Sequence, residues 1–271
     1  MATDNKIIEK LKDDKHYYGE YGQQWISNSD ISTLKDDPKS WRAPEERTLT
    51  TLTALEQGRY FHQLLLEPTK AKDFPQVEVS TRNVTEYKQY LKDNNLEFAL
   101  KKSEAKEIED CVDWIMNEKT ECTKIIRELF SSEEKLTEQP AICTLLDHEF
   151  KGKADLITKE STGQFIVVDF KTTKKNLKQI NKYMMRDFGY STQAYLYQEL
   201  FGMPFIFVFI GKNKKYLKNG EVYYDVMLVT PSKETIQEGK AIVEGALVEY
   251  DKFYREGAEH DIAKAIIIKT I

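Results

Sequence analysis

Apolar side chains in the first half of the chain recur at the three- and four-residue spacing of one helix face. This spacing predicts helices over residues 51–66, 85–93 and 103–130, the last with a break. A group of N-cap residue types at residues 27–30 predicts a further short helix that ends at Pro38. Residues 1–25 mix polar and aromatic side chains without a clear period. We expect a frayed terminus there, with an arm packed on neighbouring elements as the alternative.

The pattern changes to that of strands from Glu138 onward. Short apolar segments predict strands over residues 141–146, 150–158, 164–173, 205–210 and 222–229, and helices over residues 191–201 and 233–255. A turn at Asp147 and His148 would leave the histidine exposed. The isoleucine-rich tail, residues 262–271, would form an edge strand or an oligomer contact.

These elements predict one α/β domain with a central mixed β-sheet flanked by helices. Residues 1–135 would form a mainly helical N-terminal extension, residues 136–231 the sheet core, and residues 232–271 the last helix and the tail. A chain of 271 residues is long enough to bury a large core within one such domain.

Two charged residues follow directly after a strand that is apolar enough to be buried on both faces. Residues 165–168 are all apolar, and Asp169 and Lys171 then point to one side of the strand while Phe170 points to the other. The preceding strand carries Asp155, and a hairpin at residues 160–163 would place the two strands side by side. Buried charges are expensive unless they are paired or bind a metal.

This group of two carboxylates and one ammonium predicts a site for Mg²⁺ or Mn²⁺. Such ions are held by one or two carboxylates and take further ligands from water and substrate phosphate. A nearby lysine can position the attacking water or stabilise charge on phosphorus. The simpler alternative is an Asp169–Lys171 ion pair with Asp155 capping a turn. The position at the end of a buried strand favours the metal site.

The helix over residues 51–66 carries Gly58 and His62 one turn apart on one face. A glycine within a helix is unfavourable, so we expect a close neighbour that needs the space. His62 would be either a metal ligand or a hydrogen-bonded core histidine. Glu138, at the entry of the first strand, could add a carboxylate, and a charge at a strand edge is the simpler account.

The net charge of −5 argues against a nucleic-acid partner, but the basic residues are clustered. One cluster follows the Asp169–Lys171 strand and a second lies in a later loop. The clusters are Lys174, Lys175, Lys178, Lys182 and Arg186, and Lys212, Lys214, Lys215 and Lys218. They would line the approach of DNA to the metal, with Lys174 and Lys175 nearest, or they are two solvated loops.

Three cysteines without a C-x-x-C pair indicate neither a disulfide framework nor a zinc site. The sequence contains no apolar run of the roughly 18 residues that a membrane span needs. The polar start is unlike a secretory signal. We therefore expect a soluble, cytoplasmic protein.

Four short motifs, in their order along the chain, resemble those of the PD-(D/E)XK nuclease superfamily and of its RecB-like branch. They are Gly58-x-x-x-His62, Asp155, Asp169-Phe170-Lys171 and Gln193-x-x-x-Tyr197. With the Leu-Leu-Leu-Glu-Pro sequence at residues 64–68, the order is similar to that of phage and prophage exonucleases of the RecE (exonuclease VIII) type. The resemblance covers residues 26–231.

The resemblance implies a restriction-endonuclease-like α-β-β-β-α-β core and assigns roles to the motif residues. Asp155, Asp169, His62 and the Phe170 carbonyl would bind the metal, and Lys171 would assist the water. Gln193 and Tyr197 would contact the substrate or brace the metal site. The resemblance further implies a phage- or prophage-encoded protein, a ring-shaped homo-oligomer and a single-strand annealing protein as partner.

The resemblance thus implies a metal-dependent exodeoxyribonuclease that resects linear duplex DNA ends and leaves a 5′-phosphate and a 3′-hydroxyl. A structure-specific endonuclease or resolvase of the same fold is one alternative. A catalytically silent DNA-binding module is another. Hydrolysis of RNA or nucleotide phosphodiesters by the same chemistry is a weaker one.

Overall fold

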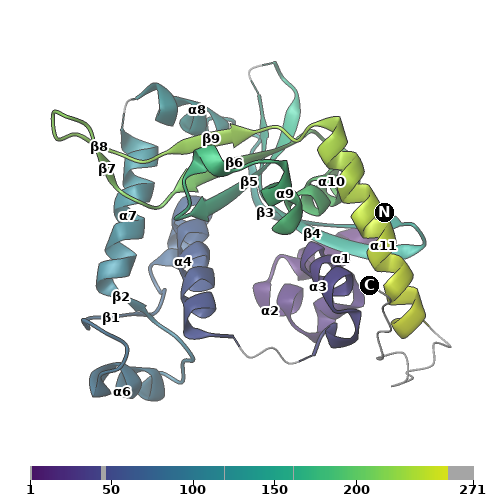
Figure 1. Cartoon of the computed structure of the whole chain (residues 1–271), viewed down its shortest axis with the longest axis horizontal. Helices are drawn as coiled ribbons and strands as arrows, with labels where there is room; N and C mark the ends of the chain where they lie inside the picture. The colour runs from purple at the N-terminus through teal and green to yellow at the C-terminus, as the bar shows by residue number, and fades with distance from the viewer. Residues whose placement is uncertain (1, 44–46, 119, 161, 256–271) are drawn as a thin grey trace, which may run out of the picture.

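A computed structural model describes residues 2–43, 47–118, 120–160 and 162–255. The predicted edge strand or oligomer contact at residues 262–271 lies outside these residues. At the centre is a five-stranded mixed sheet in the order β3-β4-β5-β6-β9 (Figure 1). Its strands are β3 (Leu136–Leu145), β4 (His148–Lys159), β5 (Phe165–Thr173), β6 (Phe205–Gly211) and β9 (Val226–Val229). Within this sheet only β5 and β6 pair in parallel, so the prediction of an α/β fold on a mixed sheet is confirmed.

Most of the predicted helices before residue 131 are present within a few residues of the predicted bounds. They are α3 (Asn28–Asp36), α4 (Leu49–Leu66), α6 (Thr85–Asp93), α7 (Lys102–Asn117) and α8 (Glu121–Phe130). Short elements between them are η2 (Pro38–Ser40), α5 (Pro68–Ala71), β1 (Gln76–Val77) and β2 (Leu100–Lys101). The side chain of Ser27 caps α3 in a capping box with Asp30, and Thr48 caps α4.

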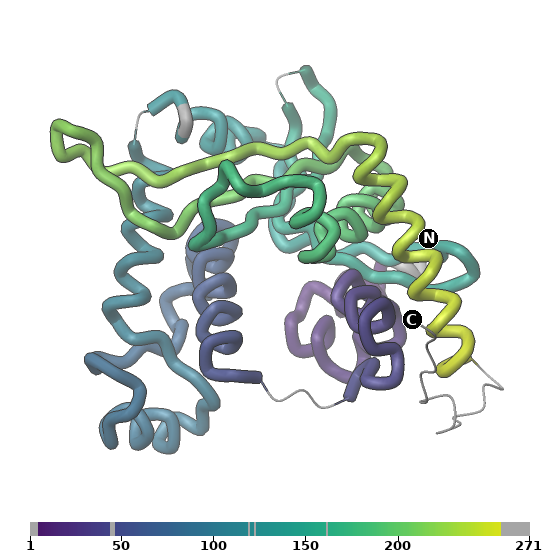
Figure 2. Tube along the Cα trace, viewed as in Figure 1, coloured from purple at the N-terminus to yellow at the C-terminus, as the bar shows by residue number. Residues whose placement is uncertain are grey.

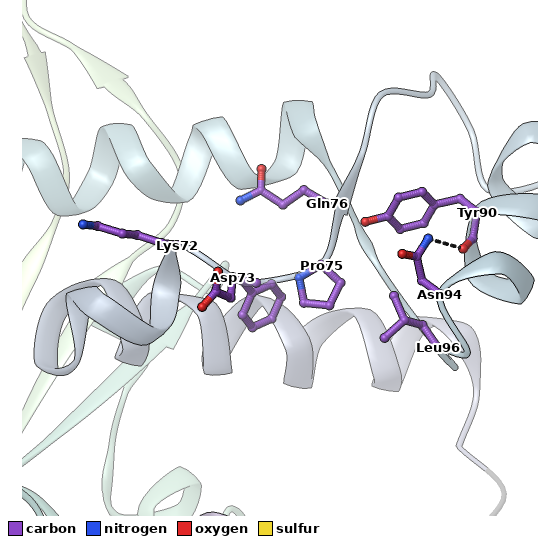
Figure 3. A pocket seen from close by; sticks show the side chains of 8 residues that line it. Lys72, Asp73, Pro75, Gln76, Tyr90, Asn94 and Leu96 are labelled. Atoms are coloured by element: carbon purple, nitrogen blue, oxygen red, sulfur yellow. Dashed lines mark hydrogen bonds between the residues drawn. The ribbon is translucent and has the colours of Figure 1, made fainter.

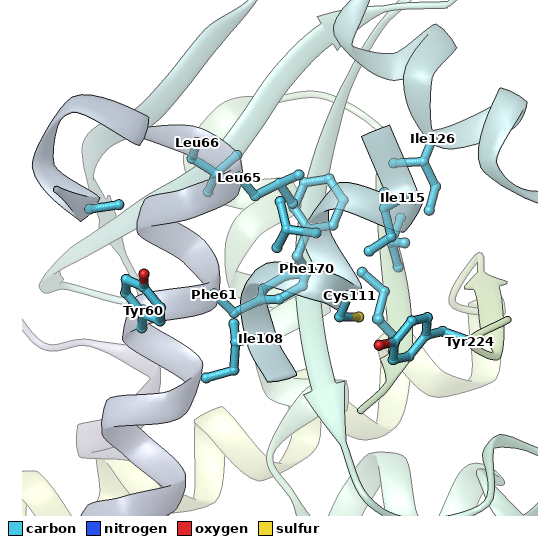
Figure 4. Packing of buried hydrophobic residues seen from close by; sticks show 14 of the residues in the cluster. Tyr60, Phe61, Leu65, Leu66, Ile108, Cys111, Ile115, Ile126, Phe170 and Tyr224 are labelled. Carbon is cyan, nitrogen blue, oxygen red and sulfur yellow. The ribbon is translucent and has the colours of Figure 1, made fainter. Parts of the chain in front are cut away.

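One face of the sheet is covered by α4 and α7, which lie side by side in Figure 1. Figure 4 shows Phe61 of α4, Ile108 and Ile115 of α7, and Phe170 of β5 packed into one apolar cluster. Phe170 is fully buried there. Because side chains alternate along a strand, Asp169 and Lys171 must point to the other face of the sheet.

The other face is covered by α10 (Tyr190–Phe201) and α11 (Lys233–Tyr254), with the short η3 (Leu177–Gln179) and α9 (Lys182–Asp187) beside them. Residues 191–197 of α10 are all buried, so this helix has no solvent-facing stripe over its first two turns. In Figure 2 the yellow α11 runs past the purple helices of the N-terminal region. Tyr254 near the end of α11 donates a hydrogen bond to the Pro38 carbonyl, 2.7 Å away.

The expectation of a frayed N-terminus is wrong. The first residues form α1 (Ala2–Leu11), α2 (Asp14–Tyr18) and η1 (Glu20–Gln24), which pack on β3 and β4. Tyr17 is buried, and Lys151 of β4 donates to its backbone carbonyl while lying 4.3 Å from its ring centroid. The anchor of this arm is a pair of lysines far along the chain, which local periodicity does not reveal.

Two local expectations in the strand region are also wrong. The tight turn lies at Leu146 and Asp147, both with positive φ, and His148 begins β4. Its side chain is only 9% exposed, and Nε2 lies 2.8 Å from Asp251 of α11. The predicted strand over residues 222–229 is interrupted: β8 (Val222–Tyr223) pairs with β7 (Lys215–Tyr216), and only β9 joins the central sheet. Among the described residues, no helix has the length and apolar character needed to cross a membrane.

Candidate metal and catalytic site

Asp155 and Asp169 are brought together by the antiparallel pairing of β4 and β5. Leu156 pairs with Val168, so Asp155 and Asp169 follow at the next step, where the two strands begin to separate. Asp155 Oδ2 fills the opening by accepting a 2.7 Å hydrogen bond from the Phe170 amide. Both carboxylates are buried. The predicted convergence of the two acids is therefore present.

Asp169 is held by two side chains. Its Oδ2 lies 2.7 Å from Lys171 Nζ, and its Oδ1 accepts a hydrogen bond from Gln193 Nε2 of α10. Oδ2 is buried and, within the described residues, has the ion pair but no well-directed hydrogen bond. Burial raises the pKa of Asp169 to about 6, although Lys171 opposes the shift. Lys171 and Gln193 therefore only partly replace the hydration that the negative charge of Asp169 loses on burial.

His62 reaches the same place from α4 on the opposite face. Its Nε2 lies 3.0 Å from the Phe170 carbonyl oxygen, and its Nδ1 lies 3.5 Å from Asp155 Oδ1. Burial alone would lower the pKa of His62, but the Asp155 carboxylate outweighs burial and raises it to about 9. The surroundings of the His62 imidazole therefore favour positive charge, as a cation-binding site does.

Glu138 is part of this site, although the sequence favoured a strand-edge charge. Ligand atoms of His62, Glu138 and Asp155 all lie within 4.8 Å of one another. The pairs Thr137–Leu156 and Gln139–Ala154 flank it, so Glu138 lies across from Asp155. Its φ of 48° is unusual for a residue with a side chain and interrupts the regular strand.

The charge on Glu138 is disfavoured by its surroundings. Burial, with the Asp155 carboxylate, raises the pKa of Glu138 to about 7. The signal that could have found this residue was the pairing of β3 with β4, which places an acid across from Asp155. The strand was predicted to begin at residue 141, and Glu138 was therefore left outside it.

These residues fit a hard divalent cation. Carboxylate and carbonyl oxygens with one imidazole are ligands that Mg²⁺ and Mn²⁺ accept. His62 Nε2 and the Phe170 carbonyl are 3.0 Å apart, close to the roughly 3 Å between neighbouring ligands of an octahedral ion bound at about 2.1 Å. The pKa values of Glu138 and Asp169 are raised because both acids are buried beside Asp155. A bound cation would stabilise their negative charges. The predicted ligand set of His62, Asp155, Asp169 and Phe170 thus gains Glu138.

Gln193 and Tyr197 were predicted to contact the substrate or to brace the metal site, and the structure places both in the interior. Gln193 holds Asp169, and the Tyr197 hydroxyl donates a 2.9 Å hydrogen bond to the carbonyl of Lys153. A Cβ at Gly152 would lie 2.5 Å from Leu200 and 3.2 Å from Tyr197, so glycine allows α10 to approach β4. Of the two predicted roles, the geometry therefore favours bracing for both residues.

The expectation of a close neighbour at Gly58 is wrong. Apart from its chain neighbours and the backbone of its own helix, no atom of the described residues lies within 4 Å of the position that a Cβ would take there, so this helix face borders open space. The adjacent Gln57 accepts a 3.1 Å hydrogen bond from Lys212 Nζ, and the Lys212 amide donates to the Thr173 carbonyl. Lys174 and Lys175, predicted to bind substrate, are exposed directly after β5. Basic groups from two loops thus border the end of β5.

A separate hollow of about 500 Å³ lies between α5, β1 and α6 (Figure 3). It is lined by Lys72, Asp73, Phe74, Pro75, Gln76, Tyr90, Asn94 and Leu96. None of these residues belongs to the cluster around Asp155 and Asp169, and the group contains no set of acids or histidines suited to a metal. The candidate chemistry therefore stays where the pairing of β4 with β5 stops, beside Asp155 and Asp169.

Comparison with solved structures supports the fold. A crystal structure described as "Putative exonuclease" from Eubacterium rectale has a TM-score of 0.57 at 16% identity, over 96% of this chain and 95% of that one. A second crystal structure, of SSO0001, covers 92% of this chain and 86% of its own at 12% identity, with a TM-score of 0.36 that is too low to support an argument. No curated protein matches the sequence.

A family model described as a PDDEXK-like domain of unknown function (DUF3799) matches residues 27–263. This match spans the sheet, α4, α10 and all the residues that converge at the site. The predicted relation to the PD-(D/E)XK superfamily is therefore confirmed: the chain belongs to this family of PDDEXK-like domains.

Proposed function

We propose that the protein is a metal-dependent deoxyribonuclease that hydrolyses phosphodiester bonds, and that it acts as an exonuclease on linear duplex DNA. The observation that carries the proposal is the convergence of Asp155, Asp169 and Lys171 where the pairing of β4 with β5 stops. His62 and Glu138 complete a group of ligand atoms beside them. An ion pair alone would not require five ionisable side chains in one buried place.

In the proposed site His62, Glu138, Asp155 and the Phe170 carbonyl would hold the ion, and Asp169 would complete the set. When bound, Mg²⁺ or Mn²⁺ lowers the pKa of a coordinated water and neutralises charge on the phosphate. Lys171, kept protonated by Asp169, orients the attacking water and stabilises negative charge on phosphorus. Gln193 and Tyr197 keep Asp169 and β4 in position. Lys174 and Lys175 receive the DNA backbone.

The test compares linear duplex, closed circular duplex and single-stranded DNA, each with Mg²⁺ or with EDTA. We expect metal-dependent loss of the linear duplex and no nicking of the circle. Asp169→Asn should reduce the rate by at least about 100-fold. Asp36→Asn, an equal charge change at an exposed acid of α3, should leave it unchanged. No metal-dependent cleavage of any DNA by the folded parent would reject the proposal.

Two outcomes point to the alternatives. Equal nicking of circles would identify an endonuclease or resolvase of the same fold. Metal-independent binding of DNA without turnover would identify a silent binding module. The predicted ring-shaped oligomer and the annealing partner stay predictions, which sedimentation and pull-down from the producing cells can test. The single-domain organisation stays a prediction as well.

A further inference from the structure

A line of aromatic rings leads from the candidate catalytic lysine to the protein surface. Lys171 Nζ lies 5.6 Å from the centroid of the Tyr190 ring, at the start of α10. The Tyr190 ring packs on Phe207 and Phe209 of β6, each with centroids 5.4 Å away. Both phenylalanines are buried in the core. The core therefore supports the Tyr190 ring at the edge of the site.

Phe188 continues this line outward. Its ring stacks on Tyr190 at a centroid distance of 5.9 Å and an interplanar angle of 26°, yet the residue is 49% exposed. Gly189 between them has φ of 69°, a value that favours glycine, and its carbonyl accepts a hydrogen bond from Asn28 of α3. The backbone therefore fixes Phe188 beside Tyr190, with much of its ring surface in solvent.

The exposed ring has cationic neighbours. Lys175 Nζ lies 4.4 Å from the Phe188 centroid, and Lys174 is exposed beside it in the sequence. Nearby on α9, Tyr183 is exposed and lies within 6 Å of the charged groups of Lys182 and Arg186. Alternating exposed rings and basic side chains are the arrangement that proteins use to bind single-stranded nucleic acid, because every base has a face that stacks and every linkage carries a charge.

A single exposed phenylalanine would need no explanation, because folded proteins expose many apolar atoms. Phe188 differs in being held rigid by Tyr190, flanked by Lys175 and connected through one ring to Lys171. A nucleic acid strand matches both the ring and the charge.

We propose that Phe188 is a stacking platform for an unpaired nucleobase of the strand that enters the active site. A base within a duplex has both faces covered by its neighbours, so the platform selects a frayed or single-stranded end. The inference rests on the proposed nuclease function for the identity of the ligand. It goes beyond that function by naming the state of the DNA that this surface binds.

The test measures binding in EDTA, where no cleavage is needed, with a short oligothymidylate and with the same oligomer carrying abasic sugars. We expect the parent to bind the thymidylate on the order of ten-fold more tightly than the abasic oligomer, as base–aromatic stacking provides. Phe188→Ala should remove most of this preference, and Phe188→Trp should keep it. Tyr216→Ala, which removes a 65% exposed ring on β7, is the matched control and should bind like the parent.

Two results would overturn the inference. One is a Phe188→Ala variant with the preference of the parent. The other is equal weakening for thymidylate and abasic oligomers, which would assign the loss to charge or to folding. The outcome is separable from that of the nuclease proposal. Cleavage by the parent with an unchanged Phe188→Ala preference rejects the platform alone, and loss of the preference in a protein without cleavage rejects the nuclease alone.

Discussion

Gln193 of α10 orients the Asp169 carboxylate, and we expect metal affinity and activity to depend on this contact. Its amide donates to Asp169 Oδ1 from a fully packed helix, so the carboxylate can turn little while Lys171 holds the other oxygen. Side chains that hydrogen-bond to a metal ligand and orient it are worth about 10- to 100-fold in metal affinity or activity. We therefore expect Gln193→Ala to lower the cleavage rate by that factor with little loss of the fold.

Kinetics at saturating and limiting Mg²⁺, with a thermal melt of each protein, check this prediction. Gln198→Ala makes the same chemical change one turn further along α10, at a half-buried position, and serves as the control. Identical rates for the two variants would contradict the bracing role of Gln193. A melt that collapses only for Gln193→Ala would assign the loss to folding.

Glu138 should oppose folding when no metal is bound. Its pKa in the folded protein is about 7, above the ordinary value of 4.5, so the folded state binds this proton more tightly than the unfolded state does. The stability it contributes is fully present below about pH 4.5 and is lost as pH rises through about 7. We expect Glu138→Gln to raise the melting temperature by a few degrees in EDTA near pH 8, and by much less near pH 4.

The same variant should bind metal more weakly. Calorimetric titration with Mn²⁺ near pH 8 should show at least about tenfold lower affinity for Glu138→Gln than for the parent, as expected when a carboxylate ligand is lost. The metal should then raise the melting temperature of the parent more than that of the variant. A variant that is less stable than the parent in EDTA at both pH values would show that Glu138 has a structural role instead.

The predictable part of the site was the part set by short-range pattern. Asp169 and Lys171 share a side because strands alternate, and Asp155 lies near them because a hairpin joins their strands. The sequence favoured a strand-edge charge for Glu138, because its place in the site depends on a third strand and on a φ of 48° that no local pattern indicates. His148 was wrongly predicted to be exposed for a similar reason, since its partner Asp251 lies 103 positions further along the chain.

The elements themselves followed their local signals wherever packing agreed with them. Capping residue types around Ser27 predicted the start of α3, apolar spacing predicted α4, and apolar runs predicted β4, β5 and β6. The N-terminal helices did not follow, because their stability comes from contacts with β4 that lie more than 120 residues away in sequence. The N-terminal helices are held by the Tyr17 ring, which packs between Lys151 and Lys153. The spacing of apolar residues along the helices carries no information about such a contact.

The N-terminal arm is therefore expected to depend on Tyr17 and to be nearly indifferent to Tyr18. Tyr17 is 6% exposed and packs beside Lys151 and Lys153, while its neighbour Tyr18 is 72% exposed. Truncation of a buried aromatic residue costs about 3–5 kcal/mol, and a surface change costs about 0.5 kcal/mol or less. Urea unfolding of Tyr17→Ala and Tyr18→Ala should show this contrast. Equal midpoints would mean that the arm is not docked in solution.

The net negative charge of the protein is unfavourable for binding DNA. Local clusters of basic residues therefore have to outweigh the repulsion from the net charge. The chain carries 45 acids against 40 basic residues. Lys174 and Lys175 nevertheless stand exposed at the end of β5, and Lys212 borders the same place from the loop after β6. A local field of this kind attracts a phosphate backbone although the protein as a whole repels it.

This difference between local and total charge can be measured from the salt dependence of DNA binding. Each phosphate neutralised by a basic residue contributes about 0.9 to the slope of log affinity against log salt concentration. Lys174→Gln and Lys175→Gln should each lower the slope by about one. Lys240→Gln on α11 changes the net charge equally, in a residue paired with Glu244, and should leave the slope unchanged. If all three variants lowered the slope alike, DNA would be sensing net charge rather than the surface beside Lys171, and the path assigned to the substrate would be wrong.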